Sequence, residues 1–553
     1  MTISVVPSPE EMRTRRAQMF PALTQAQIAR IARFGKEVEL GRGDILFDEG
    51  DHGVAFFVVL EGAVEIVHGQ GDQEEAITVH GPREFTGEIS LLANRRALVR
   101  GRAREATRVL RVEPHGLQTL LQTDSELSEV FMRAFILRRM GLFASEFGDV
   151  IVIGSRHSAA TLRLQEFLTR NAHPHRYVDV ERSPDVQACL DRLAVSVADI
   201  PVVVCRGDRV LRNPSNAELA ECLGFNAALH PESVRDVIVV GAGPAGLAAA
   251  VYASSEGLDT LVVEATAPGG QAGSSSKIEN YLGFPTGISG AALAQRALTQ
   301  AEKFGATFTV ARAVTRLQCN DGCLAIEFEG GEVVHTRAVV IATGAEYGKL
   351  DVPDLTRFEG DGVYYGATFI EAQRCETEDV IVIGGGNSAG QAATFLSRSS
   401  RHVHILVRGA GLAATMSRYL IRRIEETPNI TLHTRTRIVG LAGETSLEAV
   451  TWLDDSTGER TTLPIRHVFS MIGAKPNTEW LRGCLTLDEK GFVLTGVDVE
   501  THVHGQRPRY PFETSRNKVF AVGDVRANSV KRVASGVGEG SVCIQAVHRA
   551  LAE

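Results

Sequence analysis

Residues 236–264 combine three glycines and a terminal acid in a spacing that can bind a dinucleotide. Gly241, Gly243 and Gly246 follow one apolar run, and Glu264 ends the next. In such a turn the first glycine allows a tight bend, the second lets the backbone approach a pyrophosphate, and the third lets a helix pack closely on the strand. The helix directs its first amides at the phosphates, and the acid accepts from a ribose hydroxyl. A dinucleotide site is therefore predicted, against the alternative of a chance glycine turn.

A second glycine turn follows a second apolar run later in the chain. Its next strand ends in an arginine rather than an acid, and an arginine there can accept the 2'-phosphate of NADP where an acid would favour NAD. Two dinucleotide folds in one chain favour an electron-transfer flavoprotein with two cofactors. The alternative is a repeated fold with one inactive site. The predicted NAD(P) contacts are Gly384, Gly386, Asn387, Ser388, Ala389 and Arg408.

Residues 85–103, FTGEISLLANRRALVRGRA, resemble the phosphate-binding cassette of cyclic-nucleotide-binding domains. In that family a Gly-Glu pair, here Gly87 and Glu88, opens a short helix, and a later arginine pairs with the cyclic phosphate. The resemblance assigns the arginine role to Arg96, with Arg95 as the alternative. A glutamate can accept a ribose hydroxyl, and a guanidinium can neutralise the phosphate. The competing interpretation is a roll kept for packing, with Glu88 and Arg96 as a surface pair.

The composition limits the classes of protein to which this chain can belong. A length of 553 residues predicts three or four domains, and a hydrophobic content of 44% can fill their cores. No apolar run reaches the roughly 18 residues of a membrane span and no signal peptide is evident, which favours a cytoplasmic protein without a membrane partner. A net charge of -9 gives no basic footprint for nucleic acid. The 8 cysteines, none spaced as CxxC, predict neither a disulfide scaffold nor a metal site.

The first 148 residues carry short alternating apolar segments that are typical of an antiparallel roll. A helical segment is expected over 117–140. Because the chain then enters another strand rather than a helix-turn-helix, a transcription factor is disfavoured. The expected strands lie at 44–47, 54–60 and 63–67.

Residues 149–226 alternate strand and helix: strands at 150–154, 176–180 and 201–205, and helices at 158–169 and 184–193. The order, with Ile200-Pro201 before the last strand, resembles a thioredoxin or glutaredoxin domain, in which that proline is usually cis. The family's CxxC is replaced by residues 155–158, SRHS, so this unit cannot exchange disulfides there. His157 is interpreted as a solvated loop residue. A docking or spacer role is expected, followed by a linker over 226–235.

From residue 236 to the C-terminus the chain resembles the low-molecular-weight thioredoxin reductases. The resemblance implies an FAD domain over 235–346 and 469–553, interrupted by an NAD(P) domain over 347–468, and a homodimer formed through the FAD domains. The sequence matches on which this resemblance rests include the segments GGQ at 269–271, ENY at 279–281, ATG at 342–344, PNT at 476–478 and FAVGD at 520–524. With the first glycine turn, the implied FAD contacts are Gly241, Gly243, Pro244, Ala245, Gly246, Glu264, Gly270, Gln271, Asn280, Thr343, Gly344, Gly523, Asp524, Arg532, Val533 and Ala534.

One departure from this family bears directly on function. Thioredoxin reductases carry a CxxC at the start of the NADPH domain, which takes electrons from the flavin. Here Gly366 and Phe369 occupy the two cysteine positions. Cys375 comes too late in the segment to replace them, and Cys319 and Cys323 are interpreted as turn thiols of a hairpin. The usual route for electrons out of the flavin is therefore missing.

The sequence predicts a multidomain protein: a β-roll cyclic-nucleotide-binding domain, a small α/β thioredoxin-like domain and two α/β dinucleotide-binding domains. The predicted activity is hydride transfer from NADPH, with NADH as the alternative, to FAD and then to an unidentified acceptor such as a redox protein. A cyclic nucleotide is the predicted effector. The alternatives are thioredoxin reduction through another thiol, and a non-catalytic sensor of flavin and cyclic nucleotide.

Overall fold

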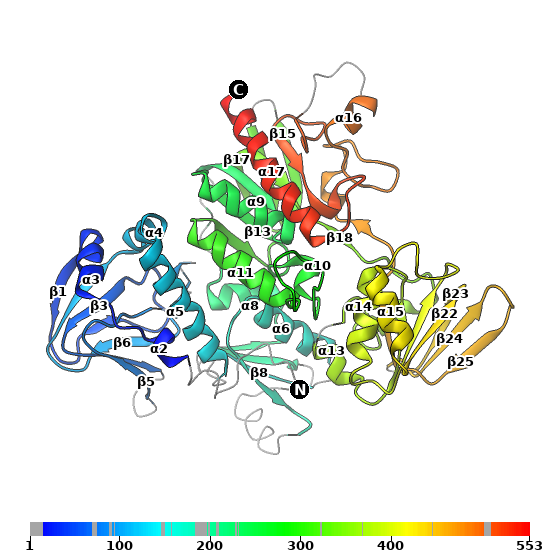
Figure 1. Cartoon of the computed structure of the whole chain (residues 1–553), viewed down its shortest axis with the longest axis horizontal. Coiled ribbons are helices and arrows are strands. Elements are labelled where there is room, and N and C mark those ends of the chain that lie inside the picture. The colour runs from blue at the N-terminus through cyan, green and yellow to red at the C-terminus, as the bar shows by residue number, and fades with distance from the viewer. Residues whose placement is uncertain are drawn as a thin grey trace.

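The computed structural model shows three folded parts around a central domain that is built on one large sheet (Figure 1). The N-terminal domain lies at the left of that view, and the domain that carries α14 and α15 lies at the right. The small unit with α6 and α8 lies below the central sheet, between them. No helix among the residues described is long and apolar enough to cross a membrane. The structure describes residues 15–68, 74–87, 91–92, 95–144, 150–155, 158–182, 196, 199–205, 209–226, 229, 232–320, 323–367, 369–444, 446–502 and 510–553.

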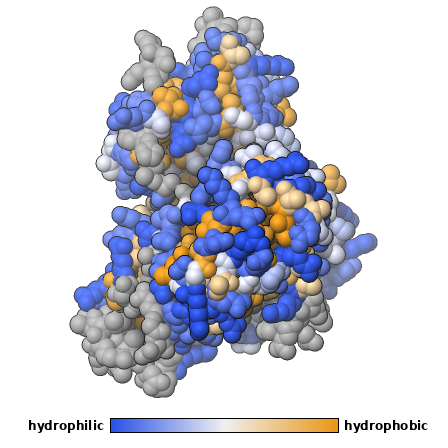
Figure 2. All heavy atoms as spheres, turned by 90° about the vertical axis from the view of Figure 1, so that its left-hand side faces the viewer, coloured by the Kyte–Doolittle hydropathy of each residue, from blue (hydrophilic) through white to orange (hydrophobic). Residues whose placement is uncertain are grey.

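The N-terminal domain is a roll of two antiparallel sheets, with strand orders β1-β7-β3 and β2-β6-β4-β5. Its core holds the rings of Phe56, Phe85, Phe131 and Phe135, which contact one another. Figure 2 faces this side of the molecule and shows apolar side chains among a mostly hydrophilic surface. The elements are α2 (Arg16–Met19), α3 (Gln25–Ile31), η1 (Ala32–Phe34), β1 (Gly35–Leu40), β2 (Ile45–Phe47), β3 (Phe56–Glu61), β4 (Val64–His68), β5 (Glu75–His80), β6 (Arg100–Ala103) and β7 (Thr107–Val112).

The helix predicted over 117–140 is wrong as a single element, because two helices cover that region. They are α4 (Pro114–Thr123) and α5 (Ser125–Ala144). Asp124 between them has an extended backbone, and its carboxylate accepts a hydrogen bond of 3.0 Å from the amide of Leu127. An aspartate that satisfies a free amide in this way starts a new helix.

The small unit contains a four-stranded sheet of order β11-β10-β8-β9, in which β8 and β9 are parallel. The Ile200-Pro201 peptide is cis, as predicted. The helix expected at 184–193 lies outside the described residues. The unit shares a core with the central domain, because Val150 and Phe167 pack in one cluster with Ala267 and Val310. Its elements are β8 (Val150–Gly154), α6 (Ala159–Arg170), β9 (Arg176–Asp179), β10 (Val202–Cys205), β11 (Arg209–Arg212) and α8 (Asn216–Leu223).

The central domain is built on a seven-stranded sheet of order β14-β13-β12-β17-β16-β15, with β28 added beside β17. The last part of the chain thus completes a sheet begun much earlier, as the interrupted arrangement requires. Its elements before the interruption are β12 (Val234–Val240), α9 (Pro244–Ser255), β13 (Thr260–Glu264), α10 (Gly270–Gly273), α11 (Gly290–Lys303), β14 (Thr307–Val310), β15 (Val314–Asn320), β16 (Cys323–Phe328) and β17 (Val333–Ile341). Those after it are η5 (Glu479–Leu481), α16 (Val497–His502), β28 (Val519–Ala521), η6 (Gly523–Val525) and α17 (Val533–Ala552).

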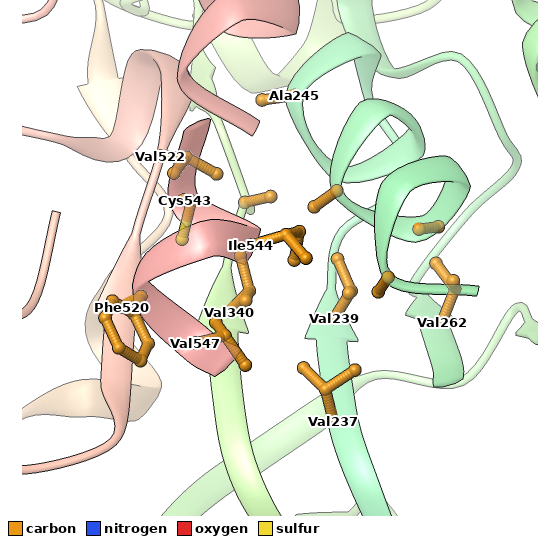
Figure 3. Close-up of a cluster of buried hydrophobic side chains, with 14 of the residues drawn as sticks. Val237, Val239, Ala245, Val262, Val340, Phe520, Val522, Cys543, Ile544 and Val547 are labelled. Carbon is orange, nitrogen blue, oxygen red and sulfur yellow. The ribbon is translucent and has the colours of Figure 1, made fainter. Parts of the chain in front are cut away.

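Helix α17 covers this sheet together with α9 (Figure 3). Ile544 and Val547 of α17 pack in one buried cluster with Val239 and Val340 of the strands. Gly540 lets the two helices touch, because a Cβ there would lie 2.2 Å from the carbonyl oxygen of Ala245. The C-terminal helix therefore fixes α9, whose first turn belongs to the first glycine turn.

The inserted domain has a parallel sheet of order β19-β26-β20-β21-β22 and an antiparallel sheet β23-β24-β25. The two chain crossings that join it to the central domain pair with each other as β18 and β27. The parallel sheet reaches Ser470, just past the predicted boundary at residue 468. Its elements are β18 (Ala345–Glu346), α12 (Leu355–Phe358), β19 (Val363–Tyr364), α13 (Phe369–Arg374), β20 (Asp379–Ile383), α14 (Asn387–Leu396), β21 (His402–Val407), α15 (Arg418–Glu426), β22 (Ile430–Thr434), β23 (Thr436–Ala442), β24 (Ala449–Asp454), β25 (Arg460–Leu463), β26 (His467–Ser470) and β27 (Lys475–Pro476).

Candidate functional site

The three glycines of the first turn have different surroundings. Gly241 has a φ of +106°, and a Cβ there would lie 2.4 Å from the carbonyl oxygen of Ala342. A Cβ at Gly246 would lie 1.8 Å from the carbonyl oxygen of Gly241. Gly243 instead faces open space, since its nearest described neighbour would be the Cα of Gly270 at 3.8 Å. Two glycines are thus needed for packing, and Gly243 leaves room for a ligand at the start of α9.

Glu264 holds the turn itself in place. One carboxylate oxygen accepts a hydrogen bond of 2.8 Å from the amide of Ala242 inside the turn. The other accepts from the amide and the hydroxyl of Thr266, each at 2.9 Å. The side chain is 8% exposed. The ribose contact stays a prediction, and the structure adds a bracing role that the sequence did not reveal.

Two of the segments predicted to wrap the flavin, 269–271 and 342–344, lie against this turn. Gly270 has a φ of +55° and lies against Gly243. The hydroxyl of Thr343 donates to the carbonyl of Asn477 at 2.9 Å, and the Asn477 amide donates back to the carbonyl of Thr343 at 3.0 Å. Gly344, with a φ of +66°, has no described atom within 4 Å of a Cβ. The Gln271 and Asn280 side chains are exposed.

Asp524 lies partly buried in η6, and burial raises the pKa of its carboxyl while the charge of Lys531 opposes that rise. Glu539 of α17 fixes the preceding residue, because its carboxylate accepts 2.7 Å hydrogen bonds from the amide of Gly523 and from Arg526. Sequence reasoning missed Glu539, since no motif links it to η6. Arg532 is exposed and occupies the N-cap position of α17, whose first turn carries Val533 and Ala534.

The second glycine turn repeats the design of the first. Gly384 has a φ of +137°, and a Cβ there would lie 2.6 Å from the carbonyl oxygen of Met471, whereas Gly386 has no described atom within 4 Å of that position. Gly386 precedes α14, where Ala389 is buried. The Asn387 side chain accepts a 2.7 Å hydrogen bond from the amide of Ser417. Arg408 is exposed after β21.

Tyr347 lies close to both predicted cofactor sites. It follows the crossing strand β18, and burial raises the pKa of its hydroxyl. A hydrogen bond with Ser388 at the start of α14 lowers that pKa in part, and the negative charge of Asp524 raises it. Sequence reasoning missed Tyr347 because contacts with Ser388 and Asp524 depend on how the two domains meet.

Gly366, one of the two residues predicted to stand at the cysteine positions of the thioredoxin reductases, lies beside a predicted flavin-wrapping segment. A Cβ at Gly366 would lie 3.9 Å from the hydroxyl of Ser274, directly after α10. Cys375 is fully buried, its Sγ lies 3.8 Å from the hydroxyl of Ser400, and burial raises its pKa to about 11. The interpretation of Cys319 as a plain turn thiol is incomplete, because its Sγ lies 2.7 Å from that of Cys484.

Of the predicted cassette, the described residues include Gly87, Arg95 and Arg96, and Glu88 lies outside them. Gly87 has a φ of +101°, and its carbonyl accepts a hydrogen bond of 2.7 Å from Arg138 of α5. Arg138 also lies over the ring of Phe85. The cassette therefore begins on the hydrophobic core of the roll.

Both cassette arginines contact the small unit. Arg96 donates to the His52 ring at 2.8 Å and to the carbonyl of Cys222 at 3.4 Å. Arg95 donates to the carbonyl of Asn171 at 3.0 Å and lies over the ring of Phe225. Its guanidinium also lies 3.5 Å from Glu302 of α11, whose side chain is 5% exposed. Arg95 is thus a domain contact, which the sequence could not show.

The comparisons with known proteins agree with this geometry. Residues 235–540 match the model of the pyridine nucleotide-disulphide oxidoreductases, and residues 37–124 match that of the cyclic nucleotide-binding domain. The chain is 34% identical over 322 residues to a thioredoxin reductase of Mycolicibacterium smegmatis, covering 58% of this chain and 98% of that protein. It is 35% identical to one of Treponema pallidum, covering 57% and 96%. A solved thioredoxin reductase of Lactococcus lactis superimposes with a TM-score of 0.53 at 27% identity, covering 57% and 99%.

Proposed function

Because the chain belongs to the pyridine nucleotide-disulphide oxidoreductase family, we propose that it is an FAD-dependent oxidoreductase that takes its electrons from NADPH. The observation that carries this proposal is the pair of open glycines, Gly243 and Gly386, each placed before a helix that follows a parallel strand. Helix N-termini of this kind attract phosphate groups. Bound FAD would supply the two-electron chemistry, and the protein supplies position and electrostatics.

The residues around the two turns fit these roles. We expect Gly243 and Gly270 to leave space for the pyrophosphate of FAD, and the partly buried Asp524 carboxyl to hydrogen-bond its ribityl chain. Gly386 and Ser388 would hold the pyrophosphate of NADPH, and Arg408, exposed after β21, is free to reach a 2'-phosphate. Tyr347, which contacts Ser388, would lie between the two cofactors.

The electron acceptor is proposed to differ from that of the thioredoxin reductases. Gly366 and Phe369 stand at the two positions where those enzymes carry cysteines. Cys375 cannot take over, since it is fully buried and its raised pKa keeps it in the unreactive thiol form. We therefore infer that reduced flavin passes its electrons to a redox protein or a small molecule without a dithiol in this domain.

Anaerobic mixing with NADPH or NADH, followed by flavin absorbance, tests this proposal. We expect NADPH to bleach the flavin at a rate on the order of ten per second or faster, near the median for enzymes. NADH at the same concentration should act more slowly, because it lacks the phosphate that Arg408 would bind. A flavin that neither nucleotide bleaches would rule out the proposed electron source and favour the sensor function.

Thioredoxin serves as a second arm of the same experiment. When the reduced protein is mixed with oxidised thioredoxin, its flavin should stay reduced for as long as oxygen is absent. Rapid reoxidation by thioredoxin would show that another thiol carries electrons, and the proposed change of acceptor would then be wrong. The homodimer through the central domains is a further expectation that sedimentation analysis can check.

We further propose that a cyclic nucleotide regulates this activity through the cassette arginines. The match of residues 37–124 to the cyclic nucleotide-binding domain supports this proposal. Arg96 donates to the His52 ring and to the Cys222 carbonyl. A cyclic phosphate would form charge-assisted hydrogen bonds with the same guanidinium. Nucleotide binding would therefore weaken the contact between the roll and the small unit, which gives the nucleotide different affinities for two states.

The test measures cyclic nucleotide binding by calorimetry and flavin reduction in parallel, with cAMP and cGMP in separate arms. We expect at least one of them to bind and to change the reduction rate at least twofold. Arg96→Gln should weaken cyclic nucleotide binding at least tenfold. The control variant Arg83→Gln removes the same charge from a neighbouring turn, and its affinity for the nucleotide should equal that of the wild type. Unchanged binding in Arg96→Gln would remove Arg96 from the nucleotide site.

A further inference from the structure

Two cysteines far apart in the sequence meet in the central domain. Cys319 lies in β15, and Cys484 lies just after η5, in the part of the chain that follows the inserted domain. Their Sγ atoms lie 2.7 Å apart, and both residues are partly exposed. Two sulfur atoms at this distance need little movement to form a covalent bond, provided that the Cβ vectors allow it.

The surroundings make one of the two sulfurs a nucleophile. The hydrogen bond between the two sulfurs and the positive charge of Arg516 lower the pKa of Cys484 to about 7, although burial opposes this. Arg516 is held in place because its Nε donates to the carbonyl of Cys484 at 3.0 Å. The pKa of Cys319 is raised by the same hydrogen bond and by burial. Of the two sulfurs, Cys484 is therefore the one that ionises more readily, and Cys319 stays the neutral thiol.

The pair lies away from the predicted flavin site. Cys319 pairs with Leu324 across the hairpin, and Leu324 pairs with Thr336 of β17. The glycine turn begins beyond Val240, which pairs with Ile341 at the other end of β17. Thr336 and Ile341 are five residues apart along β17, which is roughly 16 Å at about 3.3 Å per residue. The pair therefore cannot take electrons directly from a flavin at that turn.

We propose that Cys319 and Cys484 form a reversible disulfide, oxidised by a hydroperoxide, that acts as a redox site separate from the flavin. The Cys484 thiolate attacks the terminal peroxide oxygen, the O–O bond breaks, and the products are a sulfenic acid and, after protonation, water or an alcohol. Cys319 then attacks the sulfenic sulfur, the S–O bond breaks, and hydroxide leaves and takes up the thiol proton as water. Two thiols are oxidised for each peroxide reduced.

The bond would join the two halves of the central domain. Cys319 belongs to the half before the inserted domain and Cys484 to the half after it, so the closed loop contains the whole parallel sheet of β19 to β26. Cross-links over long loops restrict the unfolded chain strongly. Oxidation is therefore expected to raise resistance to unfolding while leaving the flavin chemistry in place. This inference does not depend on the proposed electron donor or acceptor.

The test treats the reduced full-length protein with hydrogen peroxide and maps its peptides by mass spectrometry. We expect a linked peptide pair that contains Cys319 and Cys484, and we expect dithiothreitol to release it. In Cys319→Ser, dimedone should trap a sulfenic acid on Cys484, whereas Cys484→Ser should give no trapped product on Cys319. A wild-type protein whose two thiols survive peroxide, or which links Cys484 to a different cysteine, would overturn the proposal.

Alkylation by iodoacetamide provides an independent measurement on the folded wild type. The lowered pKa of Cys484 makes a larger fraction of it thiolate at pH 7 than of an ordinary cysteine, whose pKa is about 8.5. Its labelling rate should rise with pH and level off above about 8. Arg516→Gln should slow labelling at pH 7 several-fold, and Arg482→Gln, two residues from Cys484 but 3.8 Å from Glu479, should not. Equal rates in both variants would remove the electrostatic part of the inference.

Discussion

At the scale of single residues, substitutions of Gly243 and Gly386 can test the FAD site and the NADPH site one at a time. Both have a negative φ that alanine adopts without strain, and both have room for a Cβ among the described residues. We expect Gly243→Ala to be purified with little flavin, because the methyl group would occupy the space of the pyrophosphate. Gly386→Ala should keep its flavin but need at least tenfold more NADPH for half-maximal reduction. Absorbance of the purified protein and the anaerobic reduction rate measure these two effects.

A matched control for both variants is Gly81→Ala. Gly81 lies in the N-terminal roll and likewise has no described atom within 4 Å of a Cβ and no positive φ. It should keep normal flavin content and normal reduction. If Gly386→Ala reduced its flavin as readily as the wild type, the second turn would not be the NADPH site, and the interpretation as a repeated fold with an inactive site would stand.

At the scale of elements, β21 and β22 bring a group of histidines together beside a tryptophan. The ring nitrogens of His404 and His433 lie 3.1 Å apart, and both rings contact Trp452. Burial and the charges of His402 and His433 together lower the pKa of His404 to about 4, while Asp379 opposes the shift. A folded-state pKa below the unfolded value near 6.5 means that protonation favours unfolding.

The inserted domain should therefore lose stability as the pH falls from about 6.5 towards 4, and this contribution should be constant above pH 7. Thermal unfolding at a series of pH values measures the loss. His404→Gln keeps a polar side chain of similar size that does not ionise. The melting temperature of this variant should therefore fall less steeply over that pH range. Parallel curves for the two proteins would show that His404 does not carry the effect.

Which elements could be predicted from the sequence depends on how far apart the deciding residues lie. The glycine turns, their flanking strands and the strands and first helix predicted for the small unit follow from runs of neighbouring residues, and the described part of the structure contains them. The break at Asp124 depends on a single carboxylate and was missed. Glu539, Tyr347 and the pair of Cys319 with Cys484 depend on contacts between segments that no local pattern connects, so only the fold could bring them to notice.

At the scale of the whole molecule, two consecutive residues of the small unit join the roll to the central domain. The carbonyl of Asn171 accepts a hydrogen bond from Arg95 of the cassette. The side chain of Arg170 donates to the carbonyls of Ala267 and Gly270 at 2.8 and 3.1 Å, at the predicted flavin-wrapping segment. A change at the cassette that moved the end of α6 would thus reach the segment facing Gly243. Coupling of this kind needs two states that both sites bias.

Arg170→Gln tests this connection, because glutamine is too short and has too few donors to hold the same carbonyls. We expect the variant to bind cyclic nucleotide with unchanged affinity and to keep its flavin, but to lose at least half of the nucleotide's effect on the rate of flavin reduction. Arg176→Gln removes the same charge from an exposed position on β9 and should respond as the wild type does. If Arg170→Gln kept the full response, the signal would have to cross through Arg95 and Glu302 of α11 instead, and Glu302→Gln would then be the variant that abolishes it.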